Sequence, residues 1–158
     1  MNRLCIIPCG VKKIWDSNPE ASGPYEAQIV YTGTLHKKCQ YYANMFFEKW
    51  VILSAKYGFL LPGDTVPDNY NAAFGSNSSQ IIPLAELRLQ AEDKQLTDIQ
   101  EIVVLGGKKF TSIIPQIFVS PDIKIEYPLI GCRGIGYMLQ KLDQSVSSGI
   151  ELKNITTD

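Results

Sequence analysis

The sequence predicts an α/β fold of three layers, with helices on both faces of a central, mostly parallel sheet of about four strands. Apolar runs of strand length alternate with segments of helical spacing along the chain, an order typical of parallel sheets. The first run, residues 3–8, shows little apolar–polar alternation, as expected for a strand covered on both faces. The length of 158 residues fits a single domain.

The elements follow from composition and spacing. Strands are predicted at residues 3–8, 50–55, 101–105 and 123–127, and helices at 34–46, 83–94, 108–118 and 135–145. Residues 10–30 and 61–80 are rich in Gly, Pro, Ser, Asn and Asp, which predicts two long loops. We expect residues 1–148 to form one domain and residues 149–158 to form a polar tail.

Composition excludes several classes of protein. A protein with a net charge of −1 is not expected to bind duplex DNA through a general electrostatic attraction to its phosphates. The four cysteines include no C-x-x-C pair and the chain has one histidine, so neither a structural zinc site nor another cofactor is predicted. No secretory signal is present and no apolar run approaches the roughly 20 residues of a membrane span. We therefore expect a cytoplasmic protein with free thiols and no membrane partner.

The predicted fold places one candidate site at the carboxyl ends of the strands, where open α/β sheets bind ligands. Segments 8–13, 54–58, 106–109 and 129–136 are expected to meet there. Cys9 is a candidate nucleophile because nearby ammonium groups favour the thiolate; the alternative is a half-buried small residue that closes the strand. Lys12 and Lys13 are candidates to hold a phosphate or carboxylate, although loop lysines are commonly solvated. The backbone N–H of Gly10 is a candidate to stabilise negative charge that develops on a substrate during the reaction.

Ser54 and Lys56 form a second candidate pair. A serine near a lysine can be an activated nucleophile, or the two side chains can hold a phosphate or ribose; the alternative is a turn cap beside a solvated lysine. In the following loop, Asp68 is a candidate to activate water and Tyr70 to stack on a base. Aspartates in loops also serve turns. His36 lies in the first turn of a helix, where a lone histidine is usually solvated.

Two glycine-containing segments complete the predicted site. Gly107 precedes two lysines but lacks the spacing of a Walker A phosphate loop. Arg133 and Gly134 precede the last helix, whose N-terminus could bind an anion; the alternative is a tight turn into that helix. This segment is not G-x-G-x-x-G and follows the last strand, so a nicotinamide cofactor is not predicted.

Several motifs together resemble a family of uncharacterised bacterial and phage proteins, some of which carry a peroxide-stress label. They are Pro8-Cys9-Gly10-x-Lys12-Lys13, Tyr31-Thr32-Gly33-Thr34-Leu35, the run from Ile52 to Leu60, and Pro128-Leu129-Ile130-Gly131-x-x-Gly134-Ile135-Gly136. The resemblance covers residues 3–142, and on it we assign Tyr31 and Thr32 to ligand binding.

A more distant resemblance is to the domain of archaeosine synthase that acts on a deazaguanine base in tRNA. Pro8, Cys9 and Lys13 match its motif, whereas Ile14 and Trp15 replace Pro and Tyr. The positions of its later Ser and His hold Asn18 and Ala21. These departures argue against the synthase activity itself. The resemblance implies a fold similar to uracil-DNA glycosylases and a pocket for a nucleobase.

We therefore predict a protein that binds a nucleobase, nucleoside or nucleotide, and an enzyme acting on the base or its N-glycosidic bond. A free nucleotide, a tRNA loop or a single strand fits the acidic pI of about 5.8 better than a duplex. The alternative is a non-catalytic protein that binds or sequesters a nucleotide in a phage or defence context. A third hypothesis, a protein-interaction module, predicts a large exposed apolar patch.

Overall fold

A computed structural model describes residues 2–153 and contains a five-stranded central sheet in the order β4-β3-β1-β6-β7. Its strands are β1 (Arg3–Pro8), β3 (Trp50–Ser54), β4 (Gly58–Leu60), β6 (Glu101–Val104) and β7 (Lys124–Glu126). The four strands β3, β1, β6 and β7 are parallel, and β4 pairs antiparallel with β3. All four predicted strands are confirmed, and the mostly parallel sheet is confirmed with one strand more than predicted.

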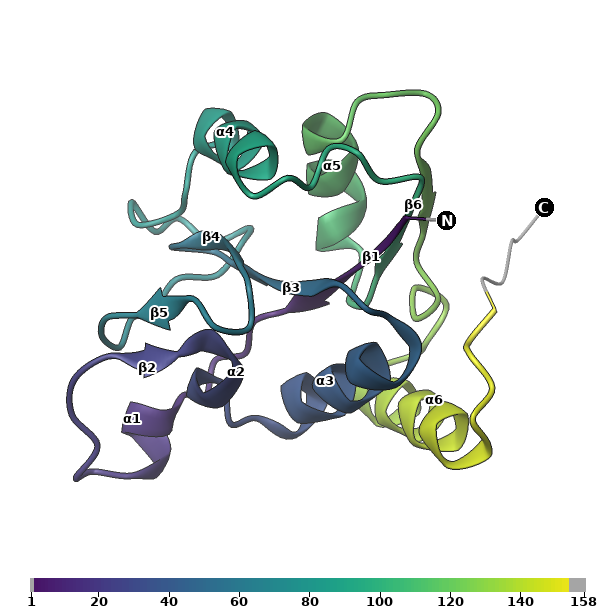
Figure 1. Ribbon diagram of the computed structural model, residues 1–158. Coiled ribbons are helices and arrows are strands. Elements are labelled where there is room, and N and C mark those ends of the chain that lie inside the picture. The colour runs from purple at the N-terminus through teal and green to yellow at the C-terminus, as the bar shows by residue number, and fades with distance from the viewer. Residues whose placement is uncertain (1, 154–158) are drawn as a thin grey trace.

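Four longer helices cover the sheet. They are α3 (Thr34–Phe46), α4 (Leu84–Asp93), α5 (Lys109–Ile117) and α6 (Ile135–Ser148). Helices α3 and α6 lie together on one side of the sheet and α4 and α5 on the other (Figure 1). Each helix was predicted, with ends that differ by at most three residues. Gly33 rather than Thr34 occupies the N-cap position of α3.

The two predicted long loops contain short elements that the sequence did not indicate. Residues 10–30 include α1 (Ile14–Ser17), β2 (Tyr25–Glu26) and α2 (Ala27–Val30), and residues 61–80 include β5 (Thr65–Val66). Strands β2 and β5 pair antiparallel, so the two segments hold each other. Ala27, Val30 and Val66 are fully buried. These few anchoring residues are too widely spaced to give a periodic signal.

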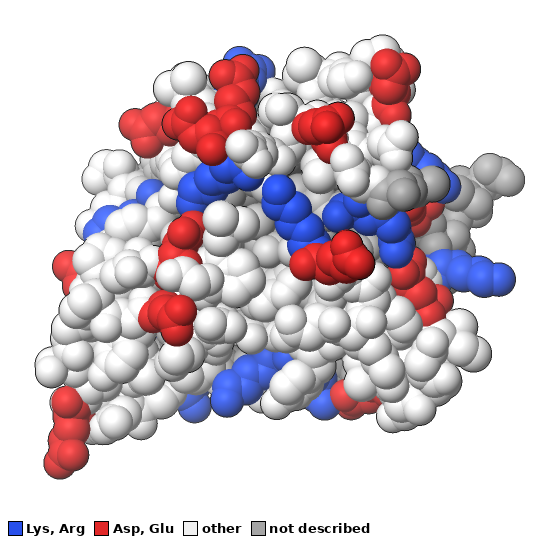
Figure 2. All heavy atoms as spheres, in the orientation of Figure 1, with Lys and Arg blue, Asp and Glu red and all other residues white. Residues whose placement is uncertain are grey.

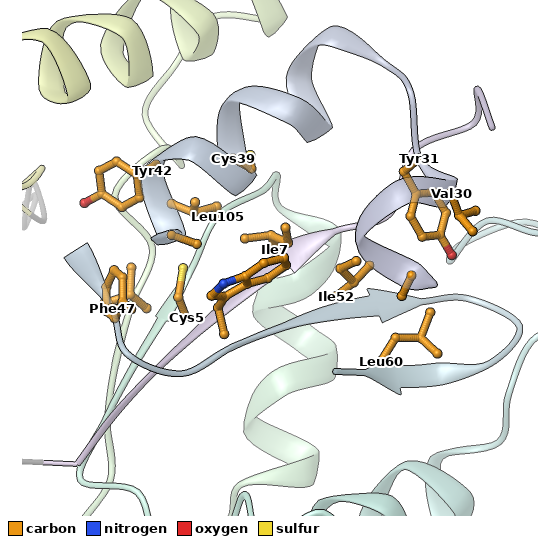
Figure 3. Close-up of a cluster of buried hydrophobic side chains, with 14 of the residues drawn as sticks. Cys5, Ile7, Val30, Tyr31, Cys39, Tyr42, Phe47, Ile52, Leu60 and Leu105 are labelled. Carbon is orange, nitrogen blue, oxygen red and sulfur yellow. The ribbon is translucent and has the colours of Figure 1, made fainter. Parts of the chain in front are cut away.

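The core lies on both faces of the sheet because successive side chains of a strand point to opposite faces. In β1, Cys5 and Ile7 belong to the cluster beneath α3, whereas Leu4 and Ile6 belong to the cluster beneath α4 and α5. Figure 3 shows the first cluster, to which Cys39 and Tyr42 of α3 contribute together with Cys5 and Ile7 of β1. Burial on both faces explains why residues 3–8 form an almost continuous apolar run.

Side chains of α4 satisfy the outer edge of β4. Gln90 accepts a hydrogen bond from the Phe59 N–H at 2.8 Å and donates to the Tyr57 carbonyl at 2.9 Å. Lys94 donates to the Phe59 carbonyl at 2.5 Å and to the Asp64 carboxylate at 2.6 Å. An unpaired sheet edge is a template for association, so these contacts close the sheet on this side.

The described part of the predicted tail contacts the domain. Glu151 receives two hydrogen bonds from Arg3, and the Leu152 N–H donates to the Tyr42 hydroxyl at 3.1 Å. Leu152 also packs against the cluster beneath α3. Residues 154–158 of that prediction lie outside the described residues. Among the helices in residues 2–153, none is both long and apolar enough to cross a membrane.

Candidate functional site

Three of the four predicted segments meet at the carboxyl edge of the sheet. Strands β1 and β3 are aligned so that Pro8 pairs with Leu53, and the Cys9 N–H donates to the Leu53 carbonyl at 3.4 Å. Cys9 and Ser54 therefore leave the same edge. On the other side of β1, the Leu105 N–H donates to the Ile6 carbonyl, which brings residues 106–109 to that edge.

Lys13 is a buried cation at this edge, with 3% of its surface exposed. An antiparallel bridge joins it to Tyr31, and its Nζ donates to the Val11 carbonyl at 2.9 Å. The Nζ atom also lies 4.4 Å from the centroid of the Tyr70 ring, a cation–π contact. Burial lowers the pKa of the Lys13 ammonium, although Cys9 and Asp16 act in the opposite direction.

Beneath Lys13, three buried hydroxyls form a chain. Tyr70 Oη lies 2.7 Å from Ser54 Oγ and 2.5 Å from Tyr31 Oη. Ser54 Oγ accepts hydrogen bonds from the N–H groups of Lys56 and Tyr57, so its own proton points to Tyr70. Tyr70 then donates to Tyr31. Burial raises the pKa of both tyrosines, so both hydroxyls are neutral at neutral pH.

Lys56 and Asp68 flank this chain nearer to solvent. Lys56 Nζ lies 5.2 Å from the centroid of the Tyr57 ring and 6.0 Å from that of Tyr70. The Tyr57 hydroxyl donates to Asp68 Oδ1 at 2.9 Å. The Tyr57 and Tyr70 rings meet edge to face with centroids 5.3 Å apart. Asp68 is therefore connected to the buried hydroxyls through the edge-to-face contact of the two rings and forms no direct hydrogen bond with them.

His36 supports the end of β1 and is buried, which corrects the expectation of a solvated histidine. Its Nδ1 lies 2.7 Å from the Pro8 carbonyl and therefore carries the proton, so Nε2 accepts from Gln40 at 2.8 Å. The ring lies against Tyr31, with centroids 4.9 Å apart. Burial lowers the pKa of His36 to about 4, because the ring has no access to water when protonated. His36 is a neutral positioning residue for the turn that carries Cys9.

Two neighbouring hollows open at this edge. The inner hollow, about 60 Å³, is lined by Cys9, Gly10, Val11, Lys13, Asn71, Ala72, Ala73, Phe74, Lys109 and Phe110. The outer hollow, about 480 Å³, is lined by Val11, Asp16, Asn69, Tyr70 and Asn71. Val11 and Asn71 line both hollows, which are therefore neighbours, and we call the two together the depression. Its size is within the range of small-molecule sites.

The predicted catalytic and ligand-binding residues fall into two groups. Those that line the depression or contact its lining through the hydroxyl chain and ring stack are Cys9, Gly10, Lys13, Tyr31, Ser54, Lys56, Asp68 and Tyr70. Those that neither line a hollow nor contact its lining in this way are Lys12, Thr32, Gly107, Arg133 and Gly134.

Four residues of the second group, Lys12, Thr32, Arg133 and Gly134, have structural positions outside the two hollows. The Lys12 carbonyl accepts from the Thr32 N–H, and the Thr32 hydroxyl bonds with Ser17, so this pair braces the turn behind Lys13. Arg133 and Gly134 are exposed at the start of α6. The loop before them is fixed by the buried Leu129, which packs beneath α3 with the core.

Sequence reasoning missed part of the lining. Phe74 and Phe110 form an edge-to-face pair with centroids 6.2 Å apart, and Lys109 Nζ lies 5.4 Å from the centroid of the Phe110 ring. Asn69 donates to Asp16 at 2.9 Å and fixes the rim of the outer hollow. Aromatic residues in a sequence are usually interpreted as core, so the role of Phe74 and Phe110 as pocket lining becomes visible only in the structure.

Charge on the face shown in Figure 2 is mixed, with Lys and Arg side chains interspersed among Asp and Glu. Binding to duplex nucleic acid uses a continuous basic surface, and this face does not present one. Within residues 2–153, no group of three or more His, Cys, Asp or Glu side chains is placed to hold a metal ion. The charged side chains that line the depression are those of Lys13, Lys109 and Asp16.

The pattern described as "Family of unknown function (DUF6884)" matches residues 5–144. The chain belongs to this family. A similar protein is the uncharacterized protein YfjM of Bacillus subtilis (strain 168), which is 48% identical over 152 residues. The similarity spans 96% of this chain and 100% of that protein. The predicted membership in an uncharacterised family is thus confirmed, and the matched region contains every residue of the depression.

Proposed function

We propose that the depression binds a nucleobase, nucleoside or nucleotide and that Cys9 is the reactive group of an enzyme acting on the bound base. The observation that carries this proposal is the lining of the inner hollow. There a thiol and a buried ammonium, from Cys9 and Lys13, lie beside the aromatic pair of Phe74 and Phe110. A planar ring with polar edges complements such a surface.

The polar groups of the depression fit the rest of such a ligand. Asn71 lines both hollows and offers an amide donor and acceptor to the edge of a base. Lys109 stands at the inner hollow with its ammonium over Phe110, where it can meet a phosphate or a ribose. The outer hollow opens to solvent and leaves room for the sugar.

The residues proposed as catalytic have different roles in this arrangement. Cys9 is half-buried and lines the inner hollow, so its sulfur can touch a ligand. Ser54 is fully buried with its hydroxyl engaged in three contacts, so it positions Tyr70 rather than attacking a ligand. Asp68 accepts from Tyr57 and is exposed, which suits proton exchange with solvent. The order of the parallel strands supports a similarity to uracil-DNA glycosylases as part of the same proposal.

A non-catalytic nucleotide-binding protein is the second candidate. It is favoured by the engagement of the hydroxyl chain in internal hydrogen bonds, which leaves Cys9 as the one thiol among the lining residues and no free hydroxyl beside it to activate it. In that case Cys9 only lines the hollow and forms no covalent bond with the ligand.

A thermal-shift screen against nucleobases, nucleosides and nucleotides tests the proposal. A ligand at 100 times its dissociation constant stabilises a protein by about 2.7 kcal/mol, so one class of compound is expected to raise the melting temperature. Phe74→Ala is expected to abolish the shift, whereas Phe46→Ala, on α3 away from the depression, is expected to retain it. Absence of a shift with every class would overturn the proposal.

Replacing Cys9 with serine separates the enzyme from the binder. If Cys9 reacts with the ligand, C9S is expected to retain the thermal shift and to lose turnover, followed by chromatography of the ligand after prolonged incubation. If the wild-type protein leaves the ligand unchanged, the non-catalytic reading holds.

A further inference from the structure

The inner hollow holds a buried positive charge that the protein neutralises only in part. An ammonium has three N–H donors, and among residues 2–153 Lys13 Nζ has one hydrogen-bond acceptor, the Val11 carbonyl. Of the described carboxylates, none forms an ion pair with Lys13. The nearest acidic side chain on its own turn, Asp16, accepts from the backbone N–H of Lys13 and from Asn69.

The surroundings of Lys13 make this charge costly in the empty site. A buried charge without a partner is strongly destabilising, and the Tyr70 ring at 4.4 Å offsets only part of that cost. The hydroxyls of Tyr31 and Tyr70 are already bonded to each other. A group that brings negative charge to Lys13 would complete the site.

The shape and walls of the hollow indicate which negative group fits. Its volume of about 60 Å³ is small beside the roughly 300 Å³ at which ligand pockets usually begin. The inner hollow therefore admits the edge of a ring, and the outer hollow of about 480 Å³ takes the rest of the ligand. The apolar residues of the lining are Val11, Ala72, Ala73, Phe74 and Phe110. The remaining lining residues are Cys9, Gly10, Asn71 and the two lysines, Lys13 and Lys109. Such walls suit an aromatic edge with delocalised charge better than a strongly hydrated phosphate.

We propose that the inner hollow selects a heteroaromatic ring that carries a negative charge, either on an ionised ring nitrogen or on a ring carboxylate, and that this charge meets Lys13 Nζ. The inference rests on the proposed function, because it names the kind of base that the pocket takes. Neutral bases of the same shape are the poorer ligands. Any phosphate of the ligand lies at the mouth of the inner hollow, where the exposed lining residue Lys109 can meet it.

Paired probes test this selection in the wild-type protein. Urate and hypoxanthine share a purine frame, and orotate and uracil share a pyrimidine frame, but at pH 7.5 only urate and orotate are anions. Isothermal titration calorimetry is expected to give dissociation constants at least about tenfold lower for the anion of a pair, as befits a charge-assisted hydrogen bond. Xanthine, which ionises near neutral pH, is expected to bind more tightly as pH rises from 6.5 to 8.5.

Lys13→Met removes the charge and keeps most of the side-chain volume. It is expected to abolish the difference within each pair, whereas Lys37→Met, at an exposed lysine of α3, is expected to preserve it. Because the paired comparison uses the wild-type protein, it stands even if Lys13→Met fails to fold.

The possible outcomes are distinct. Equal affinity for the two members of each pair would overturn the anion selection and leave the nucleobase pocket intact. Inorganic phosphate that displaces orotate at comparable concentration would overturn the ring assignment, because the hollow would then be a phosphate site. If neither heterocycles nor nucleotides bind, the proposed function fails, and with it this inference.

Discussion

Tyr70 is the residue on which the buried polar network depends. Its hydroxyl stands between Ser54 and Tyr31, and its ring receives Lys13. Tyr70→Phe leaves the Ser54 hydroxyl without an acceptor and Tyr31 without a donor. We expect a loss of roughly 1–3 kcal/mol in the free energy of unfolding, measured by urea denaturation. Tyr41→Phe, at a tyrosine with 62% of its surface exposed, is expected to change stability little.

His36 makes stability depend on pH in a defined direction. Burial lowers its pKa from 6.5 to about 4, so the folded protein holds the neutral ring between these values while the unfolded chain protonates it. The stabilisation is complete above pH 6.5 and is lost as pH falls through 4, by roughly 3 kcal/mol in total. The difference in unfolding free energy between wild type and His36→Gln isolates this term from the carboxylates.

The same histidine can be observed directly, since it is the only one in the chain. Its imidazole proton resonances are expected to remain at the neutral position from pH 8 to about 5. A titration midpoint near 6.5 would contradict the burial and both hydrogen bonds described for the ring.

At the scale of elements, the connection between β3 and β4 depends on one glycine. Gly58 has a φ of +77°, and a Cβ there would collide with the side chains of Gln90 and Ile82. Gly58→Ala therefore strains the backbone and displaces the side chain that closes the edge of β4. We expect a loss of roughly 2–4 kcal/mol by chemical denaturation.

Gly63→Ala is the matched control for that prediction. Gly63 lies in the next turn, and a Cβ there would meet the Glu26 carboxylate at 3.5 Å, an ordinary contact. A similar cost at both positions would show that the conformation of Gly58 is not the cause.

The elements that the sequence predicted are those with a long periodic or continuous apolar signal. Strands β1, β3 and β6 and helix α3 are of this kind. Strand β4 has three residues and β2 and β5 have two each, which is too short for a pattern. Their formation depends on tertiary contacts, such as Gln90 with β4, that no local pattern reveals.

Only part of the candidate site could be predicted from the sequence. Cys9 and Lys13 follow a predicted strand and Ser54 lies at the end of another, so the rule for carboxyl ends places all three on one edge. Phe74 and Asn71 come from a loop whose path is set by the docking of Tyr70, and spacing alone does not place them. Arg133 follows the last strand by the same rule, yet it lies outside the depression because the chain continues for several residues beyond β7 before α6 begins.

At the scale of the whole molecule, contacts of residues 150–152 with Arg3 and the core hold the two ends of the described chain together. Arg3 bonds with both Glu101 and Glu151, and Leu152 packs beneath α3. Combining Glu151→Gln with Leu152→Ala is expected to lower the free energy of unfolding by roughly 1–3 kcal/mol. Lys153→Gln, at the exposed neighbour, is expected to have no measurable effect; an equal loss there would show that the segment is not held by these contacts.

Protection of Cys9 from alkylation tests the central claim that a ligand occupies the depression at the carboxyl edge. Cys9 and Cys132 are both half-buried, whereas Cys5 and Cys39 are buried, and Cys132 lines neither hollow. With iodoacetamide and peptide mass spectrometry, a nucleobase or nucleotide that stabilises the protein is expected to slow alkylation of Cys9 and leave that of Cys132 unchanged. Stabilisation of the protein without protection of Cys9, or with equal protection of Cys132, would contradict the site.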